Sequence, residues 1–236
     1  MSAVVSTVKI HLNRRTETFV VPLTIAGSVA IISVLTALIF WRSGSQPGSE
    51  AWIQGSQSNP GIVYALVGFF CYLGVASVGT TFPFALALGA SRRSFVAGTI
   101  IWNALTAAYV ALILAALNAI EIATNHWFAG FYIFDIYVLG GGDTLRLLPI
   151  VFLGVLATLT IGGVFAAAWV RFGALGPQLL AGGVVLILAV AVIILVPQAA
   201  AIAAAFHLWW LAAAAIGAVV LSATGTWLLL RPATVR

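Results

Sequence analysis

Long apolar runs separated by short polar segments dominate this chain. Six of the runs are long enough to cross a bilayer, which takes about 20 helical residues. They cover Phe19–Trp41, Gly61–Leu88, Phe95–Asn118, Leu147–Val170, Gln178–Val196 and His207–Leu230. A backbone in lipid must satisfy its own hydrogen bonds, so each run is expected to form a helix. The pattern therefore predicts an all-α, polytopic membrane protein, with one transmembrane domain over residues 1–236 and a six-span bundle over residues 19–230.

Composition supports this class. Hydrophobic residues make up 63% of the 236 residues and charged residues 6%, whereas a soluble domain carries about 25% charge. The single cysteine, Cys71, lies inside an apolar run and cannot form a disulfide within the chain. The first apolar run is longer than a signal-peptide core of about 7–15 residues, so we expect the first span to be retained.

The basic residues predict the orientation, because cytoplasmic loops carry an excess of Lys and Arg. With the N-terminus in the cytoplasm, the residues on that side are Lys9, Arg14, Arg15, Arg92, Arg93, Arg171, Arg231 and Arg236. Only Arg42 and Arg146 then lie outside, together with Glu50, Glu121, Asp135 and Asp143. Both termini are therefore predicted to be cytoplasmic, with residues 231–236 as a short tail.

The first 18 residues are expected to form an amphipathic helix on the membrane surface. Val4, Val8 and Leu12 recur at four-residue spacing, which is typical of the apolar face of an interfacial helix. The alternation of apolar and polar residues over positions 8–13 also fits a strand. The adjoining membrane favours the helix.

Three segments on the outer side differ in character. The link Arg42–Pro60 is rich in Ser, Gly, Gln and Pro, which predicts a flexible connection. The segment Ala119–Arg146 is aromatic, which predicts an interfacial helix ending at Gly140–Gly142. The segment Pro197–Phe206 is interpreted either as a brief re-entrant helix or as a continuation of the sixth span.

Small residues repeat every four positions in two spans, which lets helix backbones approach closely. The two stripes are Gly154, Thr158, Gly162 and Ala166, and Ala214, Ala218, Ser222 and Thr226. Packing within the chain is the first interpretation, and an interface with a second subunit is the alternative.

The spans carry little chemistry of their own. The sequence has no His-Glu-x-x-His motif, no phosphate-binding Gly-x-x-x-x-Gly-Lys-Ser/Thr loop and no ionisable residue in the middle of a span. Ser77 would need a histidine base at similar depth to act as a nucleophile, but His207 lies at an outer helix end, and His11 and His126 lie outside the spans. We expect no catalytic residue, metal or cofactor on this chain, so any energy for work comes from another chain.

A basic bridge, Gly89-Ala-Ser-Arg-Arg-Ser-Phe95, joins the second and third runs. Gly89 permits a sharp turn, the two arginines can bond to carboxylates of a partner, and Phe95 can serve as an apolar anchor. The alternative is that Arg92 and Arg93 follow the cytoplasmic excess of positive charge and contact lipid headgroups.

The stretch Thr81–Thr99, which contains Leu88-Gly89 and Arg92-Arg93-Ser-Phe95, resembles the loop between spans two and three of type-2 ABC exporter permeases. It is most similar to the small six-span permeases of Gram-positive bacteria, whose basic N-terminal helix and cytoplasmic termini also match. The resemblance implies that Gly89, Ala90, Ser91, Arg92, Arg93, Ser94 and Phe95 form a coupling helix that docks on an ATPase. It also implies a connecting helix that includes Lys9, Arg14 and Arg15.

By the same resemblance, the chain is expected to be a permease subunit of the bacterial plasma membrane that exports an amphipathic peptide, drug or lipid. ATP and magnesium would bind a separate ABC ATPase, and a second permease copy or homologue would complete the complex; nucleic acid is not an expected partner. Trp102, Asn103 and Tyr109 are candidates for a substrate cavity, with ordinary packing as the alternative. Two other functions stay open: the substrate-capture subunit of a vitamin importer and a non-transport accessory protein.

Overall fold

A computed structural model describes residues 3–233 of the chain. Six of its helices are long and apolar enough to span a membrane, as the sequence predicts. They are Thr16–Arg42, Glu50–Ala87, Arg92–Ala123, Thr144–Phe172, Leu175–Ala204 and Leu208–Leu230. The prediction of an all-helical chain with six apolar helices of membrane-spanning length is confirmed. Residues 1–2 of the predicted surface helix, and residues 234–236 of the predicted tail, including Arg236, lie outside the described part.

The chain divides into two compact units. The first contains the residues up to His11, Cys71–Ile101 and the residues from Leu159 onward, and the second contains Leu12–Phe70 and Trp102–Thr158. Three helices pass from one unit to the other: α4 (Gly61–Gly79), α6 (Arg92–Ala123) and α7 (Thr144–Phe172). No shift in composition marks the division, because its boundaries fall inside long apolar helices.

In the first unit, α4 and α7 approach each other closely at two glycines. A Cβ atom added at Gly162 would lie 2.2 Å from the backbone oxygen of Cys71, and one added at Gly74 would lie 2.3 Å from the backbone oxygen of Leu159. Gly162 and the buried Ala166 belong to the predicted small-residue stripe. This part of the stripe therefore packs within the chain, as small residues in membrane helices commonly do.

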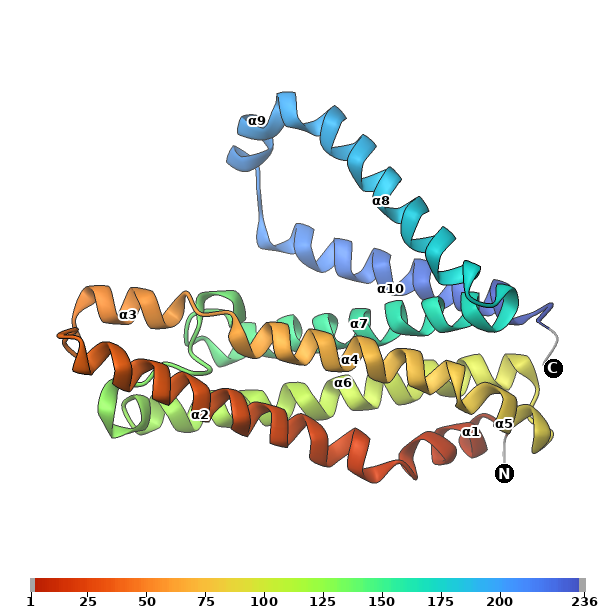
Figure 1. Ribbon diagram of the computed structural model, residues 1–236, viewed down its shortest axis with the longest axis horizontal. Helices are drawn as coiled ribbons and strands as arrows, with labels where there is room; N and C mark the ends of the chain where they lie inside the picture. The colour runs from red at the N-terminus through yellow and green to blue at the C-terminus, as the bar shows by residue number, and fades with distance from the viewer. Residues whose placement is uncertain (1–2, 234–236) are drawn as a thin grey trace. The chain divides into compact units, whose positions relative to one another are not determined.

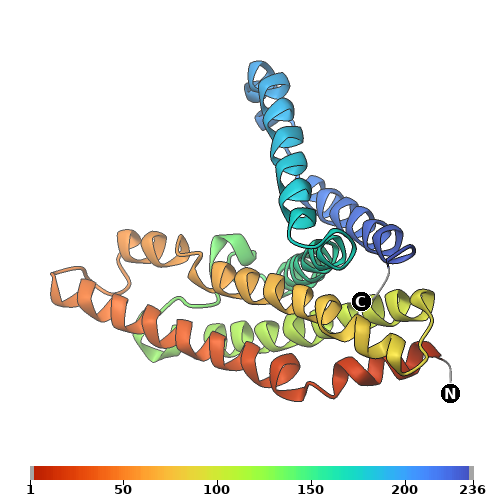
Figure 2. The same ribbon diagram turned by 45° about the vertical axis from the view of Figure 1, so that its right-hand side comes forward.

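The C-terminal part of the first unit is a helical hairpin. Its arms are α8 (Leu175–Leu195) and α10 (Leu208–Leu230), joined through a 3-10 turn and α9 (Ala199–Ala204) (Figures 1 and 2). In α10 the second stripe turns Ser222 and Thr226 inward, whereas Ala214 is exposed. By contrast, no residue in the most apolar stretch of α8 is buried.

The segment Pro197–Phe206 follows α8 without a long break and does not continue α10. The 3-10 turn Val196–Gln198 leads directly into α9, and α10 begins only after extended backbone at His207. Pro197 fits the first turn of a helix because it lacks a backbone N–H. The interpretation as a continuation of the sixth span is therefore wrong.

In the second unit, α2 (Val21–Arg42) is followed by a short helix, α3 (Glu50–Gln57) (Figure 1). The Ser49 side chain accepts a hydrogen bond from the Trp52 backbone N–H at 3.2 Å, which caps α3. The Trp52 ring is buried, and its Nε1 donates to the Gly130 carbonyl at 2.7 Å. The prediction of a flexible link over Arg42–Pro60 is wrong, because a cap and a buried anchor order its second half.

The predicted interfacial helix in Ala119–Arg146 is also wrong. α6 continues to Ala123, and within the described residues 124–143 the helical structure consists of short turns, among them the 3-10 turn Tyr137–Leu139. All three residues of Gly140–Gly142 have positive φ. We call residues 124–143 the capping loop; the backbone amides that a helix would use internally bond elsewhere here.

Candidate functional sites

The basic bridge begins with a well-formed helix end. α5 (Thr81–Ala87) closes with Gly89 at φ +83°, and the Ala90 N–H donates to the Ala85 carbonyl at 3.0 Å. The Gly89 N–H donates to the Leu86 carbonyl at 2.9 Å. This pair of bonds is the Schellman motif, which favours glycine at the left-handed position. The predicted turn at Gly89 is thus present.

α6 then begins inside the bridge, so the two arginines belong to its first turn. Ser91 caps the helix by accepting a hydrogen bond from the Ser94 N–H at 3.1 Å. Arg92 reaches the C-terminal end of α10, where it donates to the carbonyls of Arg231 and Ala233. A cation there is favourable, because helix C-termini carry partial negative charge. Arg92 is therefore used within the chain.

Arg93 is different from Arg92. Its side chain is exposed, and no ion pair with another described residue involves it. It lies in the first turn of α6, where a cation is unfavourable by about 0.3–1 kcal/mol. Stability of the helix does not explain this placement, which leaves Arg93 available to an anionic partner.

Phe95 does not form an exposed anchor. Its side chain is 0% exposed and lies in an apolar cluster with Phe82, whose ring centroid is 5.1 Å away. Phe95 also packs on the ring of His11 at 5.8 Å. The side chain instead fixes the start of α6, so any apolar contact with a partner must come from another residue.

The N-terminal segment forms α1 (Ala3–Leu12), which is a helix rather than the alternative strand. Its inward face is Thr7 and His11, both 0% exposed, whereas the predicted apolar face of Val4, Val8 and Leu12 is half-buried. The His11 imidazole bonds to the Thr99 hydroxyl at 3.0 Å. Gly98 permits this contact, because a Cβ there would lie 2.6 Å from the Thr7 Cβ. α1 thus packs on the first turns of α6.

The three basic residues assigned to the connecting helix do not share one element. Lys9 is exposed on α1 in the first unit, which also holds the bridge. Arg14 and Arg15 follow the end of α1 and belong to the second unit, where Arg14 pairs with Glu17 at 3.0 Å. Of the three, only Lys9 lies on a helix that packs beside the bridge.

The three residues predicted to line a substrate cavity are buried or half-buried in this structure. Trp102 and Asn103 are buried, and the Tyr109 hydroxyl donates to the Phe19 carbonyl at 3.1 Å. The Tyr109 and Phe19 rings also meet edge to face at 5.0 Å. None of the three lines the cavity described below.

A buried carboxylate organises the capping loop. Glu121, near the end of α6, is 0% exposed. It accepts hydrogen bonds from the indole Nε1 of Trp127 and from the backbone N–H groups of Ile133, Phe134 and Asp135, at 2.9 to 3.1 Å. Hydrogen bonds from several donors offset the cost of burying a carboxyl group. Glu121 therefore takes up amides that the capping loop would otherwise leave unpaired.

The same loop contains an uncommon backbone turn. The four residues Asn125–Phe128 all have positive φ, between 52° and 62°. This conformation costs about 1–2 kcal/mol per L-residue, so other contacts must offset it. Two bonds hold the turn: Trp127 to Glu121, and the His126 imidazole to the Asp135 carboxylate at 3.0 Å.

Next to this turn, the Tyr132 ring stacks on His126 with centroids 3.9 Å apart. Burial raises the pKa of the Tyr132 phenol above its usual 10.0, and the negative charges of Asp135 and Glu121 raise it further. The phenol therefore stays protonated through neutral and mildly alkaline pH. Tyr132 therefore adds no negative charge to the capping loop over that pH range.

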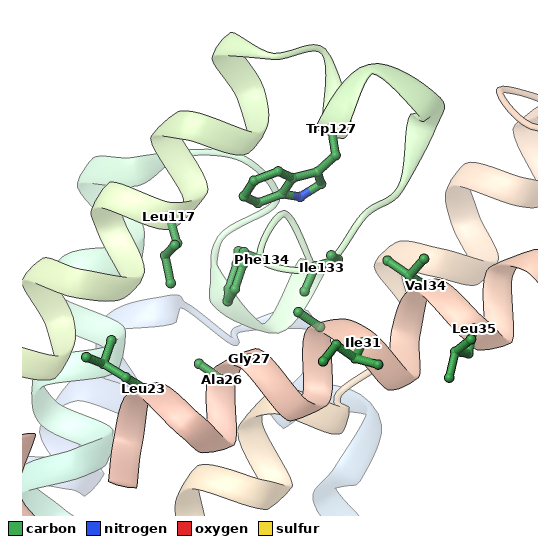
Figure 3. A pocket seen from close by; sticks show the side chains of 11 residues that line it. Leu23, Ala26, Gly27, Ile31, Val34, Leu35, Leu117, Trp127, Ile133 and Phe134 are labelled. Carbon is green, nitrogen blue, oxygen red and sulfur yellow. The ribbon is translucent and has the colours of Figure 1, made fainter. Parts of the chain in front are cut away.

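An apolar cavity of about 500 Å³ lies beneath the capping loop. Its floor is one stripe of α2, from Leu23 to Leu35, and Leu117 of α6 closes one end. Trp127, Ile133 and Phe134 of the capping loop form its rim, opposite the stripe of α2 (Figure 3). Two of these rim residues donate backbone amides to Glu121 and the third donates its indole, so the carboxylate directly positions the rim.

The sequence shows only part of this arrangement. Glu121 appears there as one of several charges outside the spans, and the aromatic residues of Ala119–Arg146 appear as interfacial anchors. A usable signal was the position of an acidic residue at the end of a long apolar run, followed by His126 and Asp135 in an aromatic segment. Comparison of the chain with protein-family models, curated proteins and solved structures finds no match.

Proposed function

We propose that this chain is the membrane permease subunit of an ATP-driven transporter, and that the bridge Gly89–Phe95 is its contact with a separate ATPase. The observation that carries the proposal is the exposed Arg93 in the first turn of α6, on a bridge that the chain itself holds in place. A rigidly mounted cation is suited to carboxylates on a partner.

Three contacts make the bridge suitable for transmitting motion. Phe95 fills the cluster under α6, Arg92 joins the bridge to the end of α10, and α1 packs on Gly98. A displacement of Arg93 would therefore move α6, α10 and α1 together. This rigidity supports a coupling role, whereas contact with lipid headgroups requires no such mounting.

The orientation belongs to the same proposal. From the excess of basic residues we infer that both termini and the bridge are cytoplasmic, and the resemblance to bacterial permeases suggests a bacterial cell. A cytoplasmic ATPase then reaches the bridge, and a second copy or a homologue of this chain completes the complex. Export of an amphipathic compound is the direction and substrate class that we propose.

The test is charge reversal at Arg93. The chain is co-expressed with candidate ABC ATPases and purified, and the ATPase activity of the complex is measured. Arg93→Glu is expected to weaken co-purification about tenfold or more, because a like-charge contact replaces an attractive one. The matched control is Arg146→Glu, which breaks only an exposed pair with Asp143 and is expected to have little effect. Equal retention of the ATPase by both variants would contradict the coupling role.

The lining of the cavity does not favour the alternative function, that of a vitamin-capture subunit. Capture of a small polar vitamin needs convergent polar side chains, and the residues around this cavity are apolar. Tight binding of a water-soluble vitamin by the purified chain without an ATPase would favour the alternative nonetheless.

A further inference from the structure

The cavity under the capping loop is preformed on its rim side. Trp127, Ile133 and Phe134 are fixed by hydrogen bonds to Glu121, which is itself fully buried. The loop has a second attachment on α3, where Trp52 bonds to Gly130 and Gln57 bonds to Asp135 at 3.1 Å. Binding sites for apolar ligands are usually preformed in this way, which keeps the cost of ordering low.

The floor of the cavity is empty and open on one side. A Cβ atom added at Gly27 meets no other atom within 4 Å. The small side chains of Ala26 and Ala30 also leave space above α2, whereas Ile31 and Leu35 are strongly exposed. Because α2 is a candidate span, this open side would face hydrocarbon. A lipid chain could enter laterally without passing through water.

A cation follows the apolar stripe on the same helix. Arg42 comes seven residues after Leu35, which places it on the same face about 10 Å further along the axis. Its side chain is exposed, and no ion pair among the described residues involves it. The groove therefore combines an apolar channel with a positive charge at the helix end, which matches an amphiphile with an anionic head.

We propose that this groove binds one acyl chain of an anionic phospholipid of the surrounding membrane, with the net negative headgroup of the lipid at Arg42. A phospholipid fits better than a soluble peptide, because the lining offers no polar partner for peptide groups. The proposal does not depend on coupling to an ATPase.

The experiment uses the full chain in nanodiscs with photoactivatable lipids. Phosphatidylglycerol carrying a diazirine in one acyl chain is compared with phosphatidylcholine carrying the same chain, and labelled peptides are mapped by mass spectrometry. We expect phosphatidylglycerol to label the peptides of Leu23–Leu35 and 127–134 at least fivefold more than those of α8, which is exposed over most of its length. Phosphatidylcholine is expected to show a smaller excess.

Two neighbouring substitutions test the groove itself. Gly27→Phe fills the floor and is expected to reduce labelling of residues 127–134 at least fivefold. Ser28→Phe places the same ring on an exposed neighbour that does not line the cavity, and is expected to change labelling by less than twofold. Arg42→Gln is expected to abolish the preference for phosphatidylglycerol while the groove peptides remain labelled.

Several results would overturn the proposal. Labelling of the groove and of α8 to the same extent would indicate ordinary boundary lipid, and this comparison needs no variant. Equal labelling by the two lipids in the unmodified chain would exclude the role of Arg42. Unchanged labelling in a folded Gly27→Phe protein would show that the chain does not enter the cavity.

Discussion

At the scale of single residues, the structure shows specific contacts for side chains that no sequence pattern distinguishes. Glu121 is one acidic residue at the end of an apolar run, yet four donors converge on it. Arg92 and Arg93 are adjacent and chemically equal, yet one is bonded to α10 and the other is exposed. The surroundings, which depend on the fold, determine what each of them does.

Glu121→Ala is expected to open the capping loop. It orphans three backbone amides and an indole N–H, and an unsatisfied buried group costs about 1–3 kcal/mol. We expect hydrogen exchange at Ile133, Phe134 and Asp135 to accelerate at least tenfold. Glu50→Ala, which removes an exposed carboxylate of α3, serves as the control and should leave these amides protected. Retained protection in Glu121→Ala would mean that packing alone holds the loop.

At the scale of helices and loops, close glycine contacts distinguish essential small residues from incidental ones. Gly154 and Gly162 lie on one stripe of α7 and are indistinguishable by spacing. Only Gly162 touches the backbone of α4; a Cβ atom at Gly154 meets nothing within 4 Å. Of these two glycines, only Gly162 therefore contributes to the close packing of α4 and α7.

Gly162→Ala is expected to lower the free energy of unfolding by about 1–3 kcal/mol, because overpacking forces the backbones of α4 and α7 apart. Gly154→Ala adds the same methyl group to the same helix and is expected to be neutral or to stabilise by up to about 1 kcal/mol. Unfolding by a denaturing detergent, followed by circular dichroism, measures both. Equal losses of unfolding free energy in the two variants would mean that the contact between α4 and α7 does not determine the effect of Gly162→Ala.

The six spans were predictable because a bilayer imposes one simple requirement, about 20 apolar helical residues. α3 and the capping loop were not predictable, because individual hydrogen bonds determine their structure. Ser49 and Trp52 organise a segment whose composition indicates flexibility. Glu121 accepts hydrogen bonds from backbone N–H groups of the capping loop, and no periodic sequence pattern indicates these bonds. The Gly89 turn was predictable because it depends on neighbouring residues. The burial of Phe95 was not, because it depends on residues that are distant in the sequence.

At the scale of the whole molecule, the charge distribution predicts one orientation in the membrane. Arg171 lies in the last turn of α7, on the side predicted to carry eight of the ten basic residues, whereas Arg42 ends α2 on the side predicted to carry only one other, Arg146. The rule that cytoplasmic loops are enriched in Lys and Arg therefore predicts that the end of α7 is cytoplasmic and that the end of α2 lies outside.

Cysteine labelling in intact cells tests this orientation. In a Cys71→Ala background, Gln46→Cys is expected to react with a membrane-impermeant maleimide. Ala174→Cys, equally exposed, is expected to react only after the membrane is opened. The reverse pattern would invert the orientation and remove the bridge from the reach of a cytoplasmic ATPase.

The bonds of the capping loop also determine the order in which the cavity assembles. Glu121 and its four donors are separated by 6 to 14 residues. Closing so short a loop costs little chain entropy, and loops of about ten residues close within roughly 10–100 ns. The floor comes from α2, far earlier in the chain. The rim can therefore begin to fold against the end of α6 through these local bonds, and the distant contacts with α2 and α3 complete the cavity afterwards.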